Sequence, residues 1–267
     1  MSPSPVLTSV RSPRVQAVRR LTRRSAREAE GRFVVEGPQA VREALDRLLE
    51  LYVDVSAAER HADLLATTTC PVTPVSAAVL DAMADTPSPQ GVLGVAPLLD
   101  VPLAVALGRS PRLVCVLEAV SDPGNAGTVL RTADAAGADA VVLTEGSTDP
   151  HGSKCVRASA GSLWHLPVAS GPPLAETVRV ARAAGLSVLA TTGGAGEDLD
   201  DLIDRGELAT PTAWLFGNEA AGLSDSAMGL ADRAVRIPLH GRAESLNVAA
   251  AAAICLYASA RAHRVPR

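Results

Sequence analysis

The chain has 267 residues, of which 47% are hydrophobic and 20% charged, with a formal net charge of −4. This composition excludes a disordered chain, which has few apolar residues and a high net charge, and four cysteines are too few for a small disulfide scaffold. Aromatic residues make up only 2%, so we expect a core of Ala, Val and Leu.

The charge is distributed unevenly along the chain. Residues 1–32 hold eight arginines against two glutamates, a net charge of +6, whereas the other residues hold 17 basic and 27 acidic side chains, a net charge of −10. A basic arm on an acidic body favours a polyanionic partner such as RNA or DNA, although a solvated arginine-rich helix has the same composition. The arginines that we expect to bind nucleic acid are Arg19, Arg20, Arg23, Arg24 and Arg27.

The sequence shows no pattern for secretion, a membrane span or a metal site. Residues 1–14 lack the apolar stretch of a signal peptide, and the longest apolar run, 246–258, is too short to cross a bilayer. The cysteines are scattered, without a CxxC pair or a histidine at metal-ligand spacing. We therefore expect a cytoplasmic protein without a metal.

Helical and strand patterns alternate in the first part of the chain. A helical arm is expected at about 13–30, and the patterns then predict strands at 33–35, 51–55, 72–75 and 91–96, with helices at 38–49, 57–66 and 76–84. The stretch 97–111 has three prolines and little periodicity. We therefore predict a first α/β domain at 1–97, a linker at 98–111 and a second domain at 112–267.

The alternation is more regular in the second domain. Strands rich in Val and Leu are predicted at 113–119, 140–144, 163–168, 186–191, 213–216 and 234–237, and the last helix from Ser245 to about residue 262. Such strands separated by helices indicate a parallel sheet covered on both faces. Ligands of these sheets bind beyond the carboxyl ends of the strands, which directs attention to the loops after Ala119, Thr191, Phe216 and Ile237.

Three of these loops carry polar residues that core packing does not require. The first holds Asn125, with Arg131 six residues further on, and the second holds Glu219 directly after a predicted strand. The third holds Ser245 and Asn247 at the start of a helix, where unpaired backbone N–H groups bind oxygen-rich ligands. Each also has a purely structural interpretation, because Asn and Ser are common N-caps and an arginine on a helix is often just solvated.

The loop after Thr191 is glycine-rich but does not match a dinucleotide-binding site. Leu199 stands where the third glycine of GxGxxG would be, and the loop is not in the first βα turn of its domain. The sequence thus disfavours an NAD-dependent enzyme.

Taken together, the three polar loops resemble the motifs of the SpoU/TrmH family of RNA ribose 2′-O-methyltransferases, in the SPOUT superfamily. The matching residues, in chain order, are Asn125-x-Gly127-x-x-x-Arg131, Phe216-Gly217-Asn218-Glu219-x-x-Gly222-Leu223 and Ile237-Pro238-x-x-Gly241-x-x-Glu244-Ser245-Leu246-Asn247-Val248-Ala249. The resemblance covers about residues 113–260. Residues 11–45 in turn look like the RNA substrate-binding domain of the family, which has a ribosomal-protein-like α/β fold.

The resemblance implies a parallel-sheet α/β domain with a deep trefoil knot, S-adenosylmethionine as cofactor, and a homodimer with active sites at the subunit interface. It implies catalytic roles for Arg131, Asn125, Glu219, Ser245 and Asn247. It also implies cofactor contacts at Thr191, Gly193, Gly217, Ile237 and Leu246. The implied substrate is RNA, with 23S ribosomal RNA as first choice, transfer RNA as the alternative, and a non-catalytic ribosome-assembly protein as a third.

The role of Arg131 stays open at this point. The family proposal makes it the base that takes the proton of the ribose 2′-hydroxyl, but a guanidinium group remains protonated in almost every setting. Alternatively, it holds the adjacent phosphate and stabilises the developing alkoxide.

Overall fold

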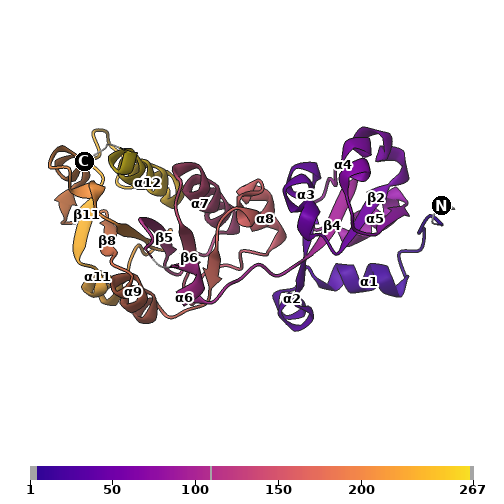
Figure 1. Ribbon diagram of the computed structural model, residues 1–267, viewed down its shortest axis with the longest axis horizontal. Coiled ribbons are helices and arrows are strands. Elements are labelled where there is room, and N and C mark those ends of the chain that lie inside the picture. The colour runs from indigo at the N-terminus through magenta and orange to yellow at the C-terminus, as the bar shows by residue number, and fades with distance from the viewer. Residues whose placement is uncertain (1–4, 109, 265–267) are drawn as a thin grey trace. The chain divides into compact units, whose positions relative to one another are not determined.

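The computed structural model describes residues 5–108 and 110–264 of the chain (Figure 1). The chain divides into two compact units. The first unit consists of Met1–Leu98 and His151–Trp164, and the second of Leu99–Pro150 and His165–Arg267. The chain thus leaves the first unit, builds part of the second, and returns for one short segment.

The second unit is built on a seven-stranded sheet in which every pair of neighbours is parallel. Its spatial order is β7-β6-β5-β10-β8-β11-β9. The strands are β5 (Leu113–Leu117), β6 (Ala140–Leu143), β7 (Val168–Ser170), β8 (Ser187–Thr192), β9 (Glu197–Asp198), β10 (Thr212–Phe216) and β11 (Arg233–Arg236). Because all strands run the same way, the loops after β5, β10, β8 and β11 leave from one edge of the sheet, as predicted for an α/β fold.

Helices cover both faces of this sheet (Figure 1). One face is covered by α7 (Pro123–Ala136) and α12 (Val248–Arg264), and the other by α6 (Leu103–Ala106), α9 (Leu174–Ala183) and α11 (Asp225–Leu230), with α10 (Leu199–Asp204) near the end of the sheet. The neighbouring strands β5 and β10 are buried on both faces. On β10, the indole Nε1 of Trp214 donates to Ser259 Oγ of α12 at 2.9 Å. This burial explains why these strands have near-continuous apolar sequences.

The first unit is a smaller α/β structure with a four-stranded sheet in the order β1-β4-β2-β3. Only the β2–β3 pair is parallel. The strands are β1 (Arg32–Glu36), β2 (Glu50–Asp54), β3 (Val72–Val75) and β4 (Val92–Pro97), and the helices are α1 (Pro13–Arg20), α2 (Arg24–Glu30), α3 (Pro38–Ala44), α4 (Ala62–Thr67), α5 (Ala77–Met83) and α8 (Ser153–Ser159), with short 3₁₀ turns at 45–47, 55–57 and 59–61. Helices α1 and α5 bury a hydrophobic cluster against one face of this sheet.

The N-terminal arm differs from the single helix that was predicted. It forms two helices with a corner at residues 21–23, and Arg27 stabilises that corner. The Arg27 guanidinium is buried and donates to the carbonyl oxygens of Leu21 at 2.8 Å and Thr22 at 2.9 Å. Arg27 was predicted to bind RNA, but unlike the other arginines of the arm it is buried, and its Nη1 holds the corner between the two helices. Side chains Arg19, Arg20, Arg23 and Arg24 are exposed.

The segment His151–Trp164 also differs from prediction, which placed it in the second domain. Its helix α8 packs against β1, and the Phe33 ring lies 4.7 Å from the ring of His151 and 6.0 Å from that of Trp164. A strand was predicted at 163–168, but residues 162–164 form a 3₁₀ turn and β7 begins only at Val168. The apolar run at 163–168 resembles one strand, but its first residues, Leu163 and Trp164, belong to the first unit, where Leu163 is buried.

Candidate active site

A cavity of about 480 Å³ lies at the carboxyl ends of the central strands of the second unit. It is bounded by the loops after β8, β10 and β11 and by the start of α12. The sheet order explains this convergence, since β8 lies between β10 and β11. The five residues predicted to contact a cofactor all line the cavity: Thr191, Gly193, Gly217, Ile237 and Leu246. Two of the predicted catalytic residues, Glu219 and Ser245, line it as well.

The loop after β10 folds back tightly on itself. Asn218 and Gly222 exchange backbone hydrogen bonds of 3.0 and 2.8 Å, and Gly222 has a φ of +68°. At Gly217 an added Cβ would lie 2.3 Å from the carbonyl carbon of Gly222 and 2.4 Å from the backbone N of Leu223. Only glycine fits there, so Gly217 lets two stretches of backbone meet beside the cavity.

Asn218 joins this loop to the loop after β5. Its amide Nδ2 donates to the carbonyl oxygen of Ala119 at 2.8 Å, while its Oδ1 accepts from the backbone N–H of Ala220 at 3.0 Å. Ala119 itself has a φ of +50°, which is unusual for a residue other than glycine. The two loops therefore form one connected structure at the sheet edge.

Glu219 organises the start of α7. One carboxylate oxygen accepts from the backbone N–H of Asp122 at 3.1 Å and from Asn125 Nδ2 at 3.0 Å. The other accepts from the backbone N–H and the hydroxyl of Ser121, both at 3.2 Å. Partial burial opposes the charge, but the hydrogen bonds from Asn125, Ser121 and Asp122 outweigh it and hold the pKa of Glu219 below its usual value. Glu219 is therefore an ionised acceptor at neutral pH.

Asn125 connects Glu219 to the third loop. Its Oδ1 accepts from Asn247 Nδ2 at 3.0 Å, so three segments far apart in the chain join through Glu219, Asn125 and Asn247. The alternative interpretation of Asn125 as an N-cap is wrong, because Asp122 caps α7 by accepting from the Asn125 backbone N–H at 2.8 Å. Because the Asn125 side chain does not cap the helix, it can bridge Glu219 and Asn247.

The last helix begins later than predicted, at Val248. Asn247 Oδ1 accepts from the backbone N–H of Ala249 at 2.8 Å, so Asn247 takes the capping position and Ser245 lies before the helix. The Ser245 hydroxyl borders the cavity and forms no hydrogen bond with any residue that the structure describes. The prediction that Ser245 starts this helix is therefore wrong.

Arg131 is not part of the hydrogen-bonded network. It lies on α7, is exposed, and forms no hydrogen bond or ion pair within residues 5–108 and 110–264. The structure thus joins Asn125, Glu219 and Asn247, places Ser245 at the cavity beside them, and leaves the Arg131 guanidinium available to an external anion.

Asp122 and Asn218 are organising residues of the site that sequence reasoning missed. The Asp122-Pro123 pair carries the signal for the first, since proline favours the first helical position and aspartate the N-cap before it. Nothing in the sequence indicates the partner of Asn218, because Ala119 is 99 positions away along the chain.

Within the described residues, no group of three or more His, Cys, Asp or Glu side chains is placed to hold a metal ion. In that same part of the chain, no helix has the length and apolar character to span a membrane.

Comparison with known proteins agrees with this geometry. The model of the SpoU rRNA Methylase family matches residues 112–257, and that of the MRM3-like substrate binding domain matches residues 12–94. The 23S rRNA (guanosine(2553)-2′-O)-methyltransferase RlmP of Bacillus subtilis is 33% identical, over 94% of this chain and 97% of its own length.

Two solved structures resemble the fold over most of its length. The AdoMet-bound rRNA methyltransferase from Sinorhizobium meliloti has a TM-score of 0.84 at 33% identity, covering 98% of this chain and 99% of its own. The SpoU methyltransferase AviRb from Streptomyces viridochromogenes, in complex with AdoMet, has a TM-score of 0.86 at 30% identity, covering 96% and 100%. The chain therefore belongs to the SpoU rRNA methylase family, with an MRM3-like substrate-binding domain at its N-terminus.

Proposed function

We propose that this protein transfers a methyl group from S-adenosylmethionine to a ribose 2′-hydroxyl of 23S ribosomal RNA. The observation that carries the proposal is the meeting of the cavity lined by Gly217, Ile237 and Leu246 with the network of Asn125, Glu219 and Asn247. Relatives that share most of the chain are named as 23S rRNA 2′-O-methyltransferases, which supports the same reaction and substrate class.

The cavity fits the proposed cofactor. Its volume of about 480 Å³ lies within the range of roughly 300–1,000 Å³ typical of small-molecule sites. The tight loop at Gly217 brings backbone within reach of a ligand, and Thr191, Gly193, Ile237 and Leu246 surround the remaining space. When bound, S-adenosylmethionine supplies the activated methyl group and its own leaving group. The protein's residues then have to align the ribose and handle one proton.

The network supplies the alignment in this proposal. The ionised Glu219 holds the start of α7 by its bonds to Ser121 and Asp122, which fixes Asn125. The Ser245 hydroxyl borders the cavity and is suited to hydrogen-bond a sugar hydroxyl, while the Asn247 amide holds Asn125 in place. Arg131 either takes the 2′-hydroxyl proton or binds the neighbouring phosphate, and its exposed guanidinium favours the second role, because guanidinium groups are poor bases and this one keeps its donors for an external anion.

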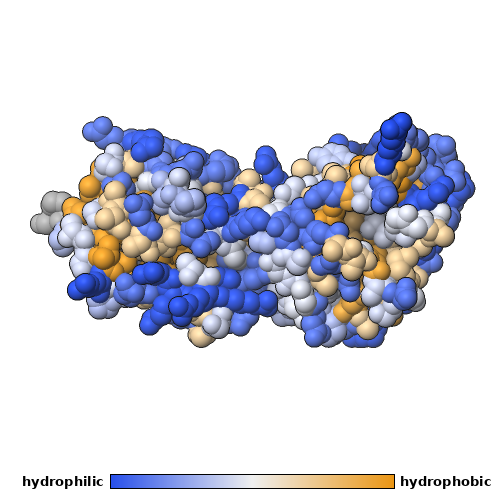
Figure 2. Space-filling model, turned by 180° about the vertical axis from the view of Figure 1, so that it is seen from behind, coloured by the Kyte–Doolittle hydropathy of each residue, from blue (hydrophilic) through white to orange (hydrophobic). Residues whose placement is uncertain are grey.

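We further propose that the protein acts as a homodimer through α12. Ile254 and Tyr257 lie one turn apart on this helix, and their exposed fractions are 42% and 52%. Figure 2 shows that hydrophobic residues on the face in view form separate patches among hydrophilic ones. An exposed aliphatic and aromatic pair on a long helix is typical of protein interfaces. The trefoil knot implied by the family and the cytoplasmic location expected from the sequence remain predictions.

RNA is held by the arginine arm in this proposal. Arg19 and Arg23 are exposed, and neither forms an ion pair within the described residues, whereas Arg20 lies 3.7 Å from Glu30 and Arg24 2.8 Å from Glu28. Such exposed pairs are weak, so these arginines remain able to exchange a carboxylate for phosphate.

The proposal is tested by incubating the protein with radiolabelled S-adenosylmethionine and total RNA. The expected result is label in large-subunit ribosomal RNA at one linkage that resists alkaline hydrolysis, because a methylated 2′-oxygen cannot attack its phosphate. Label in transfer RNA alone would overturn the choice of substrate. RNA binding without any transfer would indicate a non-catalytic assembly protein.

A further inference from the structure

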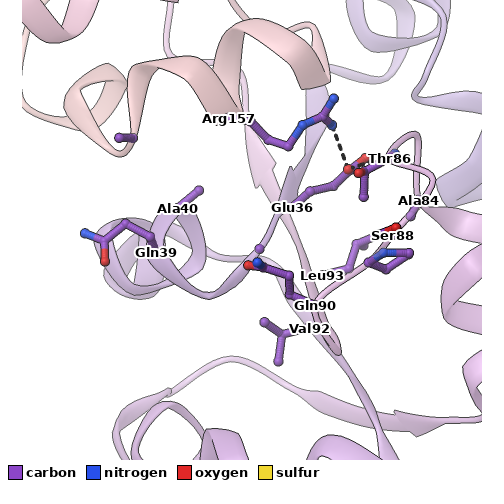
Figure 3. Close-up of a pocket in the computed structure, with 13 residues that line it drawn as sticks. Glu36, Gln39, Ala40, Ala84, Thr86, Ser88, Gln90, Val92, Leu93 and Arg157 are labelled. Atoms are coloured by element: carbon purple, nitrogen blue, oxygen red, sulfur yellow. Dashed lines mark hydrogen bonds and ion pairs between the residues drawn. The ribbon is translucent and has the colours of Figure 1, made fainter.

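The first unit contains a cavity of about 250 Å³ that the proposed methyl transfer does not use (Figure 3). It lies between the end of β1 with the start of α3, the loop from α5 to β4, and helix α8. The residues that line it all belong to the first unit: Glu36, Gly37, Gln39, Ala40, Ala84, Thr86, Ser88, Pro89, Gln90, Val92, Leu93, Arg157 and Ala160.

Glu36 holds the walls of this cavity together. Its side chain is 3% exposed and accepts from the backbone N–H groups of Asp85 at 2.7 Å and Thr86 at 3.2 Å. It also accepts from Arg157 Nη1 at 2.8 Å, the ion pair drawn in Figure 3. Glu36 thereby ties the 84–90 loop and α8 to the end of β1. Since its partners are all within the protein, it shapes the cavity and leaves ligand binding to its neighbours.

The rim carries hydrogen-bonding groups that are not used within the protein. Gln90 is anchored through its backbone carbonyl, 2.8 Å from His61 Nε2, and its side-chain amide makes no hydrogen bond to any described residue. The same holds for the hydroxyls of Thr86 and Ser88 within that part of the chain. Arg157 donates to Glu36 through Nη1, and its side chain is one-third exposed. Most of its five N–H donors are therefore available to a ligand.

The remaining lining is apolar and is formed by aliphatic side chains such as Ala40, Val92 and Leu93 (Figure 3). An apolar floor suits the flat face of an aromatic ring, and an amide and hydroxyls at the rim match the mixed donors and acceptors on the edge of a nucleobase. A guanidinium beside them suits a phosphate. The volume of about 250 Å³ lies below the roughly 300 Å³ at which drug-sized sites begin, so it admits one base and excludes a dinucleotide.

We propose that this cavity binds one unpaired nucleotide of the RNA substrate, with the base inside and its phosphate at Arg157. Sequence-specific RNA recognition relies on unstacked bases of loops and bulges, whose edges are accessible to side chains. The same unit carries the exposed arginines of the arm, which bind phosphates without reading sequence. The cavity thereby adds selectivity to the arm. This inference rests on the proposed function for its choice of RNA.

The test measures binding of unmodified, in vitro transcribed 23S ribosomal RNA by the full-length protein. One variant, Ser88→Ala with Gln90→Ala, removes the rim groups, and a second, Ser88→Trp, fills the cavity from an exposed position. Thr69→Ala is the matched control, because Thr69 is an exposed hydroxyl residue of the same unit outside the cavity.

Both cavity variants are expected to raise the Kd for RNA about tenfold, or about 1.4 kcal/mol. The affinity for S-adenosylmethionine should not change, and the slope of binding against salt should change by at most about one unit, since only the phosphate at Arg157 can be lost with the nucleotide. Binding equal to that of Thr69→Ala would overturn the inference. It would also be overturned if naked RNA were bound normally while methylation of whole ribosomal subunits fell, because a ribosomal protein would then occupy the cavity.

Failure of this inference is distinguishable from failure of the proposed function. If the unaltered protein binds RNA in a cavity-dependent way but transfers no methyl group, the proposed function fails and the inference stands. If it methylates RNA and the cavity variants bind like the control, only the inference fails.

Discussion

The carboxylate of Glu219 accepts hydrogen bonds from Ser121, Asp122 and Asn125, and these bonds join the loop after β10 to the start of α7. Both of its oxygens are used, each by two donors. A neutral amide has only one oxygen, so it leaves one pair of donors facing an NH₂ group. The chemistry of this position therefore requires a carboxylate and not merely a polar residue.

Glu219→Gln is expected to lower kcat about tenfold, because two donors lose their acceptor and Asn125 loses its orientation. Glu176→Gln is the control, since Glu176 is exposed on α9 and its ion pair with Arg179 is long, at 4.0 Å. Methyl transfer at saturating RNA and S-adenosylmethionine measures the effect. Equal kcat values for the two variants would show that Glu219 does not organise the site.

The same carboxylate makes stability depend on pH. Its pKa is lower in the folded protein than in the unfolded chain, so its contribution is complete above the unfolded value of about 4.3 and is lost as pH falls through the folded value. The Tm of the unaltered protein should therefore exceed that of Glu219→Gln by a constant amount from about pH 5 to 8, and this excess should shrink as the pH falls below the unfolded value of about 4.3. An excess that stayed constant or grew on acidification would contradict this.

Arg131→Ala is expected to lower methyl transfer about 10²- to 10³-fold, the loss typical of removing one group that stabilises developing negative charge. Folding and S-adenosylmethionine binding should be unchanged, because Arg131 is exposed and bonded to no described residue. Arg179→Ala is the control, with a side chain 71% exposed on α9. Near-normal turnover of Arg131→Ala would exclude the role assigned to it.

The loop from Gly217 to Gly222 forms much of the cavity wall. Its shape depends on direct contact between the backbone at its beginning and the backbone at its end. The pattern of glycines and polar residues after a predicted strand indicated a binding loop, which the structure places at the cavity. The pattern did not indicate how the loop closes, because that closure is made by backbone groups common to all residues.

Gly217→Ala is expected to abolish S-adenosylmethionine binding and lower the Tm by several degrees, since its Cβ would lie 2.3 Å from the Gly222 backbone. Gly229→Ala is the control, because Gly229 lies in α11 with open space at the Cβ position. Calorimetric titration and thermal unfolding measure the two effects. Normal cofactor binding by Gly217→Ala would mean that this loop does not form the cofactor site.

At the scale of elements, local sequence patterns did not predict the residues at which helices α7 and α12 begin. Asn125 and Ser245 both have residue types that favour N-caps, but Asp122 and Asn247 hold those positions. The choice among neighbouring capping residues depends on which side chain has a better partner elsewhere. Asn125 has such partners in Glu219 and Asn247, and these come from other parts of the chain.

At the scale of the whole molecule, the exposed residues of α12 lead to a prediction about assembly. Ile254→Glu with Tyr257→Glu is expected to convert a dimer of twice 27.4 kDa into a monomer and to abolish methyl transfer, because two charges would be buried at the interface. Val105→Glu is the control, at a residue of α6 that is 61% exposed. Light scattering after gel filtration gives the masses. A monomeric unaltered protein would contradict the dimer.

Periodicity by itself determined the α/β class and the parallel sheet of the second unit, whereas the cavity residues were implied by the resemblance of three motifs to the SpoU/TrmH family. The α/β class and the sheet depend on interactions within a few turns or strands, which local sequence records. Tertiary structure alone decided that Arg27 is buried, that His151–Trp164 packs on β1, and that Asn125 bridges Glu219 to Asn247. The last two depend on partners distant in sequence, which no local pattern encodes. The burial of Arg27 depends on the corner between α1 and α2, where Leu21 and Thr22 accept its hydrogen bonds, and the helical pattern did not reveal that corner.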